Sequence, residues 1–263
     1  MGQVLIRKRL HESSQEFTDL DKLPPEVAIG ILSHLNATDL CLAGCVWQHL
    51  ANDQILWKGV CRSEFGFSPT GDLKASEYKR IFLQLDEATL TFNANPENGI
   101  NYLLRYGLIE NVPSQIAEFL YRNRKIHWRR RRDYLQKRPD VLQEIIGLEN
   151  FKNLFLPNAL RKFFAKNRPT NDRGEYLHLL IDAFSKRFST CNPNLNINPE
   201  AIYVICFSLI LLSVDLSSPH IRNKMSKREF IKNTKRAASI DEEFCGHLYD
   251  NIYLVGHVAP TDL

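Results

Sequence analysis

The chain has 263 residues, of which 44% are hydrophobic and 24% charged, so it can bury a core in one or two domains. Its 12 Gly and 12 Pro residues argue against long low-complexity regions. The formal net charge of +4 is too weak a basic balance to indicate nucleic-acid binding by itself.

Cysteine usage and the absence of targeting signals favour a cytoplasmic protein. The six cysteines form no CxxC pair and have no histidines at zinc-finger spacing, so most are expected to be buried free thiols. The first ten residues become basic before an apolar segment builds up, and no secretory signal is predicted. The longest apolar run, residues 201–214, is shorter than a membrane span and predicts a buried helix. No metal or other cofactor is expected.

Three short amphipathic helices are predicted between residues 23 and 60. Pro24 and Pro25 suit the first turn of a helix, where a missing N–H costs little, and Glu26 complements the positive end of that helix. Turn signals at residues 36–39 and 52–53 separate the three helices. Their apolar faces contain Val27, Ile31, Leu32, Leu35, Ala43, Val46, Trp47, Leu50, Leu56, Trp57 and Val60.

A larger helical array is predicted after a loop at residues 66–72. One helix is expected at residues 76–86, and Ser226 with Glu229 forms a capping-box signature. Because no segment alternates with the period of a strand, the fold class is all-α, with a small three-helix unit before the array. The further helices are expected at residues 97–106, 113–122, 127–137, 140–147, 150–167, 175–189, 199–213, 226–238 and 241–253.

The first unit, residues 20–66, resembles an F-box. The resemblance rests on LPPE at residues 23–26, ILS at 31–33, DL at 39–40, Trp47 and LW at 56–57. It implies binding to the Skp1 adaptor of a cullin-type ubiquitin ligase. A unit this small has more apolar side chains than it can bury, and a partner would cover the remainder.

The side chains expected to contact the adaptor are apolar residues of the motif. They are Leu23, Pro24, Ile31, Leu32, Leu35, Leu40, Val46 and Trp57. The alternative is that these residues form a core packed on the C-terminal domain.

Residues 92–257 resemble a Sec7 domain, the exchange-factor domain for ARF GTPases, with residues 67–91 as a linker that contains a helix. Ordered matches extend from FNANP at residues 92–96 through ALR at 159–161 and CNP at 191–193. The resemblance implies a hydrophobic groove that grips the switch segments of a GTPase. The residues expected at this groove are Phe207, Ile210, Leu211, Asp215, Phe230 and Ile231.

The resemblance also implies a catalytic glutamate on an exposed loop, where its carboxylate would repel the β-phosphate of GDP. The family loop reads roughly FRLPGE, whereas residues 167–175 read NRPTNDRGE. Glu175 is the candidate glutamic finger, and its alternative role is a first-turn acid at a helix N-terminus. Counted back from the downstream helix, the finger position lies near Arg173, which would attract phosphate instead. A second family motif, NTDLHNP, is replaced by SVDLSSP at residues 213–219.

Residues 122–138 form a basic stretch with His127 and Trp128 interleaved. The favoured interpretation is a solvated helix face. Attraction to anionic membrane surfaces, which would place the protein at the periphery of membranes, is the alternative. Nucleic acid is not an expected partner.

The sequence therefore predicts an adaptor without bond-making activity of its own. Its F-box would recruit a cullin ligase, and its Sec7-like domain would engage an ARF-family GTPase. The alternative is an exchange factor that promotes GDP/GTP exchange on an ARF GTPase and so regulates ARF signalling and vesicle traffic. No P-loop, HExxH or GxSxG pattern occurs, so the chain itself is not expected to bind a nucleotide.

Overall fold

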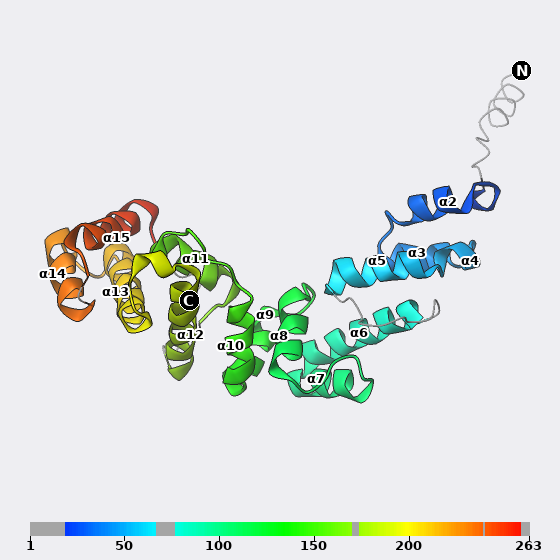
Figure 1. The fold of residues 1–263 in the computed structure, drawn as a ribbon, viewed down its shortest axis with the longest axis horizontal. Helices are drawn as coiled ribbons and strands as arrows, with labels where there is room; N and C mark the ends of the chain where they lie inside the picture. Colours follow the sequence, from blue (N-terminus) through cyan, green and yellow to red (C-terminus); the bar gives the residue numbers. More distant parts are fainter. Residues whose placement is uncertain (1–18, 67–76, 170–173, 239, 259–263) are drawn as a thin grey trace, which may run out of the picture. The chain divides into compact units, whose positions relative to one another are not determined.

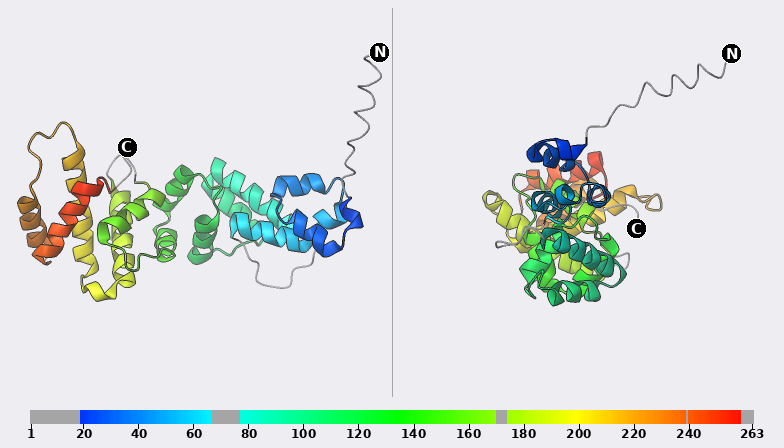
Figure 2. Two further views of the ribbon diagram at one scale, coloured as in Figure 1. Left: turned by 90° about the horizontal axis from the view of Figure 1, so that it is seen from above. Right: turned by 90° about the vertical axis from the view of Figure 1, so that its right-hand side faces the viewer.

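The structure, a computed structural model, describes residues 19–66, 77–169, 174–238 and 240–258. Every regular segment in these ranges is a helix (Figure 1, Figure 2), which confirms the all-α prediction. The chain divides into two compact units, and the boundary lies between Gln84 and Leu85, inside helix α6 (Glu77–Ala94). Unit 1 precedes this boundary and unit 2 follows it.

Unit 1 consists of short helices joined by tight turns. Before α6 it contains η1 (Leu20–Lys22), α2 (Pro25–Leu32), α3 (Ala37–Ala43), α4 (Gln48–Ala51) and α5 (Gln54–Phe65). The second predicted helix is broken in two, because Trp47, with φ −114° and ψ 62°, leaves the helical region before α4 begins. The Trp47 indole Nε1 donates a hydrogen bond of 2.7 Å to Asp19 Oδ1, which stabilises this break.

Trp57 lies at the centre of the core of unit 1. Its side chain is fully buried, and its Nε1 donates to the Ala51 carbonyl oxygen at 2.8 Å. The rings of Trp57 and Phe65 lie 5.4 Å and 5.3 Å from the ring of Phe82. Aromatic packing therefore joins α5 to the first turns of α6.

Helix α6 is longer than the helix predicted at residues 76–86. It continues to Ala94 because Ala88, Thr89 and Phe92 are also buried, which extends the apolar face by two turns. The close approach of the next helix, α7, requires a glycine at position 99. A Cβ atom there would lie 2.5 Å from the Cα and Cβ atoms of Phe92, so a larger residue would force the two helices apart.

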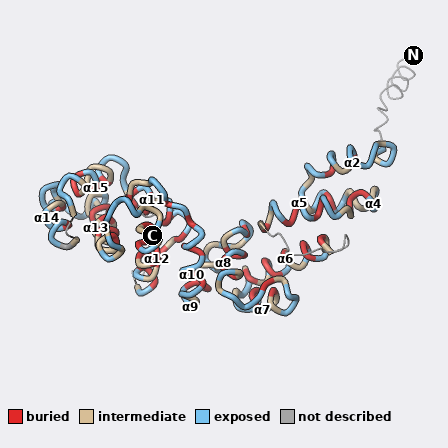
Figure 3. Tube along the Cα trace, in the orientation of Figure 1, coloured by how far each residue is buried: buried red, intermediate tan, exposed pale blue. Residues whose placement is uncertain are grey.

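Unit 2 is an array in which each helix packs on the next helix along the chain or on the one after it. The pairs include α8 with α10, α12 with α13, and α14 with α15. Figure 3 shows buried stripes along these helices. The helices are α7 (Pro96–Arg105), α8 (Pro113–Arg122), α9 (Trp128–Lys137), α10 (Pro139–Gly147), α11 (Leu156–Lys166), α12 (Glu175–Cys191), η2 (Pro193–Leu195), α13 (Pro199–Ser217), α14 (Lys227–Ala238) and α15 (Glu242–Val255).

The helix predicted at residues 150–167 begins only at Leu156. Residues 150–155 instead form an irregular segment that contributes to the core. Asn153 has a φ of 60°, and its N–H donates to Asn192 Oδ1 at 2.9 Å. Phe151 is fully buried, with its ring 5.1 Å from that of Phe184. The prediction was wrong here because these contacts come from a distant helix.

Helix α13 extends to Ser217, four residues beyond the predicted end. By length and composition alone it could cross a membrane. However, it packs against α12, α14 and α15, and it buries Ile205, Cys206 and Leu209 in the unit. This packing is that of a central helix in a helical array.

The capping box predicted at the start of α14 is present. The Glu229 N–H donates to Ser226 Oγ at 3.3 Å, and the Ser226 N–H donates to Glu229 Oε2 at 2.9 Å. The Ser226 N–H and the Ser226 hydroxyl both donate to Glu229 Oε2, and these two bonds hold the pKa of Glu229 below its ordinary value. The local sequence signal therefore identified this helix start correctly.

Candidate protein-binding surfaces

Three of the candidate adaptor-binding residues belong to the core of unit 1. Leu32, Leu40 and Trp57 expose 2%, 1% and 0% of their surface. A partner cannot reach these side chains while the unit is folded. Their role in any interface is to hold α2, α3 and α5 in place.

The other five candidates lie at or near the surface. Ile31 and Val46 are 47% and 70% exposed. Pro24 is exposed, and Leu23 and Leu35 are half-buried. They lie in or beside α2 and in the turn after α3, where a partner could bury them.

Val27 and Leu42 are exposed apolar residues that the predicted set did not include. Val27 precedes Ile31 by four positions on α2, and i,i+4 spacing on a helix places two side chains on the same side. Leu42 is near the end of α3, and Val46 lies in the turn that follows it. We call Val27, Ile31, Leu42 and Val46 the exposed apolar set. Four exposed apolar side chains in a unit this small make it a candidate interaction surface.

Two thiols lie beside this set. Cys41 and Cys45 are exposed, whereas Cys61, Cys206 and Cys245 are buried. Burial raises the pKa of Cys61 to about 12, so this thiol is unreactive at neutral pH. The expectation of buried thiols thus holds for three cysteines, and the exposed pair offers a chemical probe of the surface.

Residues of α12 and α13 form an aromatic cluster at the surface of unit 2. His178 Nδ1 and Tyr203 Oη are 2.6 Å apart, and the Phe207 ring lies 4.9 Å from the His178 ring. Leu211, one turn beyond Phe207, is 59% exposed. We call His178, Tyr203, Phe207 and Leu211 the α12–α13 face. His178 was not among the predicted site residues, because nothing in the local pattern relates it to a tyrosine 25 residues away.

The remaining predicted groove residues of α13 and α14 are less available. Phe230 is only 2% exposed, and its ring packs 5.9 Å from that of Tyr249. Ile231 is half-buried beside Gly246 of α15. Ile210 is half-buried on α13. The structure therefore places Phe230 in the core and does not expose it to a partner.

Asp215 anchors the connection between α13 and α14. Its Oδ2 accepts the Met225 N–H at 2.8 Å, and its carbonyl oxygen accepts a bond of 2.6 Å from Lys224 Nζ. The Met225 carbonyl in turn accepts a hydrogen bond from Tyr249 Oη at 3.0 Å. These contacts give Asp215 a structural role at the end of α13.

Glu175 is exposed and is the first residue of α12. No side-chain hydrogen bond caps this helix start at Gly174, so a carboxylate in the first turn stabilises the positive end of α12. The other candidate position, Arg173, lies outside the described residues. In the ranges that are described, no group of three or more His, Cys, Asp or Glu side chains could hold a metal ion.

Comparison with known families agrees with this architecture. Residues 20–63 match the F-box-like family, and residues 82–254 match the Sec7 domain family. The chain is therefore an all-α protein that combines an F-box with a Sec7 domain. It is 52% identical to F-box only protein 8 of Homo sapiens over 264 residues, which cover 97% of this chain and 82% of that protein. The chain belongs to the F-box only protein 8 family.

Two further relatives correspond to the Sec7 part. The ADP-ribosylation factor guanine nucleotide-exchange factor sec72 of Schizosaccharomyces pombe is 35% identical over 179 residues, which cover 65% of this chain and 10% of that protein. The solved Sec7p catalytic domain superposes with a TM-score of 0.55 and 28% identity, covering 64% of this chain and 93% of that domain.

Proposed function

We propose that this protein is a substrate-recognition subunit of a cullin-type ubiquitin ligase, and that its F-box binds the Skp1 adaptor. The observation that carries the proposal is the exposed apolar set, whose members expose 47–70% of their surface in a unit with a well-packed core. Because these side chains are already partly covered, burying the rest of each on a partner would contribute about 0.7–2 kcal/mol. Membership of the F-box-like family supports Skp1 as that partner.

Val46→Asp is expected to weaken adaptor binding by about 30-fold or more, because it removes an apolar contact and places a charge in the interface. Stability should change by less than about 0.5 kcal/mol, since Val46 is 70% exposed. Leu83→Asp is the matched control, because Leu83 is 51% exposed on α6 of the same unit. Calorimetric titration with purified Skp1 measures both variants.

Alkylation of the exposed thiols gives an independent readout of the same surface. Skp1 should slow the alkylation of Cys41 or Cys45 by a maleimide in wild type. In Val46→Asp, the adaptor should leave the rate of alkylation unchanged. Equal binding by wild type and Val46→Asp, together with unprotected thiols, would show that the exposed apolar set is not the adaptor surface.

The client of this ligase is proposed to be an ARF-family GTPase that docks on the α12–α13 face. Partly apolar side chains at helical spacing suit the capture of apolar anchors from a partner. The support from relatives is that sec72, an exchange factor for ADP-ribosylation factor, matches this part of the chain at 35% identity. In this proposal the F-box recruits the ligase and unit 2 selects the GTPase.

The alternative proposal is an exchange factor for an ARF GTPase. The observation in its favour is that Glu175 is exposed at the end of the α11–α12 connection, where a carboxylate could reach a bound partner. The altered loop sequence and the arginine near the finger position favour the ligase-subunit proposal over the exchange factor. Both proposals require binding of a GTPase, so only GDP release distinguishes them.

GDP release from an ARF GTPase is expected to be unchanged by this protein, and Glu175→Lys should behave like wild type. A Sec7 domain with known exchange activity serves as the positive control in the same fluorescence assay. Stimulation by wild type that disappears in Glu175→Lys would establish the exchange factor instead. Acceleration by Arg173→Glu alone would show that position 173 is the finger position and that its charge suppresses exchange.

A cytoplasmic location is part of the proposal. The free thiols among the described residues support a reducing compartment, because exposed cysteines such as Cys41 and Cys45 would oxidise outside it.

A further inference from the structure

An open pocket of about 530 Å³ lies at the start of α9 in unit 2. This volume is within the range of roughly 300–1,000 Å³ that small-molecule sites span, so the pocket exceeds the needs of a single inorganic ion. Four of its side chains are cationic and one is a carboxylate. The lining residues are Asn93, Lys125, His127, Arg129, Arg130, Arg132 and Asp133.

Asn93 fixes the two sides of this pocket relative to each other. Its Oδ1 accepts the His127 N–H at 2.7 Å, and its Nδ2 donates to the Lys125 carbonyl oxygen at 3.0 Å. Its own carbonyl oxygen accepts a hydrogen bond from Arg130 Nε at 3.1 Å. One residue of α6 thus holds both the α8–α9 connection and the first turn of α9.

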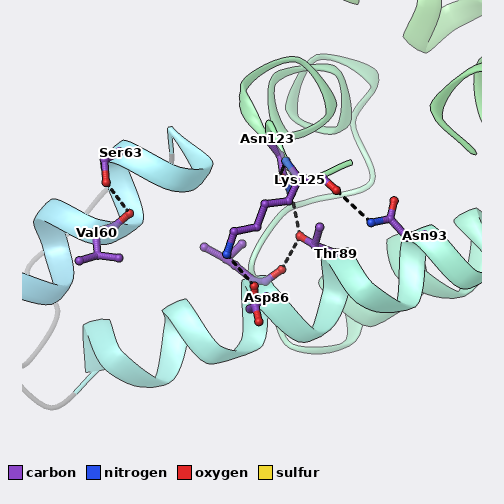
Figure 4. A network of polar contacts seen from close by, with 8 residues as sticks. Val60, Ser63, Asp86, Thr89, Asn93, Asn123 and Lys125 are labelled. Carbon is purple, nitrogen blue, oxygen red and sulfur yellow. Dashed lines mark hydrogen bonds and ion pairs between the residues drawn. The ribbon is translucent and has the colours of Figure 1, made fainter. Parts of the chain in front are cut away.

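A second polar network links the α8–α9 connection to α6 (Figure 4). Asn123 is buried, its Nδ2 donates to Thr89 Oγ1 at 2.7 Å, and its Oδ1 accepts the Lys125 N–H at 3.0 Å. Lys125 Nζ pairs with Asp86 Oδ1 at 3.0 Å. The Lys125 backbone is held at its N–H by Asn123 and at its carbonyl oxygen by Asn93, so the pocket is preformed.

The arginines of α9 have separate roles. Arg131 points away from the pocket lining and donates to the Lys166 carbonyl oxygen, and its partial burial lowers the pKa of its guanidinium. Arg130 and Arg132 share one carboxylate, Asp133, at 3.9 Å and 3.4 Å. Within the described ranges, Arg129 forms no ion pair with a carboxylate. The pocket therefore keeps an excess of positive charge.

Two observations show unused donor capacity at this site. The Arg132 Nε atom is buried and has no hydrogen-bond partner among the described residues. Helix α9 begins at Trp128, and His127 supplies no side-chain cap, so the first amides of a ten-residue helix have no intrahelical acceptor. Guanidinium forks and free helix amides are the donors that proteins use to bind phosphate.

The environment of Trp128 argues against a nucleic-acid site. The guanidinium carbons of Arg129, Arg132 and Arg168 lie 5.2, 5.4 and 5.0 Å from the centre of the Trp128 ring. Single-stranded nucleic acids bind through bases stacked on aromatic rings. Stacking on Trp128 would have to displace these cation–π contacts, whereas a phosphate could bind the same guanidinium groups without disturbing the ring.

We propose that this pocket binds a multiply phosphorylated polyol of the inositol phosphate class. The ligand could be carried by a membrane lipid or be free in solution, and the pocket recognises the phosphate groups in either case. The proposal rests on the size of the pocket, its cationic lining and the unpaired donors beside it. The pocket shares no residue with the two protein-binding surfaces, and the proposal does not depend on their proposed partners.

The test compares two double variants with the same change in charge. Arg129→Gln with Arg130→Gln alters the pocket, and Arg122→Gln with Lys137→Gln removes two exposed basic residues of the same stretch outside it. Within the described part of the chain, each control residue forms a single exposed ion pair, with Glu118 at 2.8 Å or Glu97 at 2.9 Å, so its loss should cost little.

Calorimetric titration with inositol hexakisphosphate should show binding by wild type, about hundredfold weaker binding by the pocket variant, and at most about threefold weaker binding by the control. Flotation with phosphatidylcholine vesicles that contain a phosphatidylinositol bisphosphate, or an equal charge of phosphatidylserine, separates the two sources. Preference for the phosphorylated lipid supports a lipid headgroup. Binding of the soluble ligand without vesicle binding supports a free metabolite.

Asn93→Ala provides a second variant that leaves the charge unchanged. It should weaken inositol hexakisphosphate binding about tenfold in protein that still unfolds cooperatively, because the pocket loses its organising hydrogen bonds. Equal losses in the two double variants would show diffuse charge attraction and overturn the proposal. The absence of binding to either probe, or tighter pocket-dependent binding of single-stranded RNA, would also overturn it.

Discussion

Trp57→Ala is expected to lower the free energy of unfolding of unit 1 by about 3–5 kcal/mol. The indole is fully buried, and its loss leaves a cavity beside Phe82 and an unpaired Ala51 carbonyl oxygen. Single domains are stable by only about 5–15 kcal/mol, so much of the stability of this small unit would be lost. Adaptor binding should fail because the surface is no longer held in place.

Hydrogen–deuterium exchange of peptides from α5, combined with chemical denaturation, measures this effect. Trp47→Ala is the control, because Trp47 is half-buried and its indole forms one exposed hydrogen bond with Asp19. That variant should lose only about 1 kcal/mol. If the amides of α5 remain as protected in Trp57→Ala as in wild type, Trp57 is not the centre of the core.

The contrast between Trp57 and Val46 explains what the sequence could predict about the first site. Both residues lie on apolar helical patterns, and the resemblance to an F-box selected both. Helical spacing identifies the apolar side of a segment, but burial depends on which neighbouring element covers it. Ile31 and Leu32 show this limit, because adjacent positions on α2 are 47% and 2% exposed.

In unit 2, the signals that predicted helices well were local. Pro113, Pro139 and Pro199 each stand at the first position of a helix, as expected from their missing N–H group. The features that escaped prediction depend on contacts between distant residues. Asn153 turns toward Asn192, and the carboxylate of Asp215 binds the amide of Met225, although the sequence pattern shows neither partner.

Leu211 and Phe230 belong to the same predicted GTPase-binding set, but Leu211 is exposed and Phe230 is in the core, so their substitutions should have different effects. Leu211→Asp should leave the stability of unit 2 within about 0.5 kcal/mol of wild type, since Leu211 is 59% exposed. It should weaken binding of an ARF-family GTPase by about 30-fold or more, because a charge would replace an apolar contact on the α12–α13 face. Phe230→Ala should instead lower the free energy of unfolding of unit 2 by about 3–5 kcal/mol, because Phe230 is buried.

Leu254→Asp is the control for this pair, because Leu254 is 78% exposed on α15 of the same unit and lies outside the α12–α13 face. Thermal unfolding and calorimetric titration with the GTPase should be measured on all three variants. If Leu254→Asp weakens binding as much as Leu211→Asp does, the GTPase contacts α15 and the α12–α13 face is not its site. If Phe230→Ala weakens binding without loss of stability, Phe230 must leave the core to meet its partner, since a side chain that is 2% exposed cannot contribute from its present position.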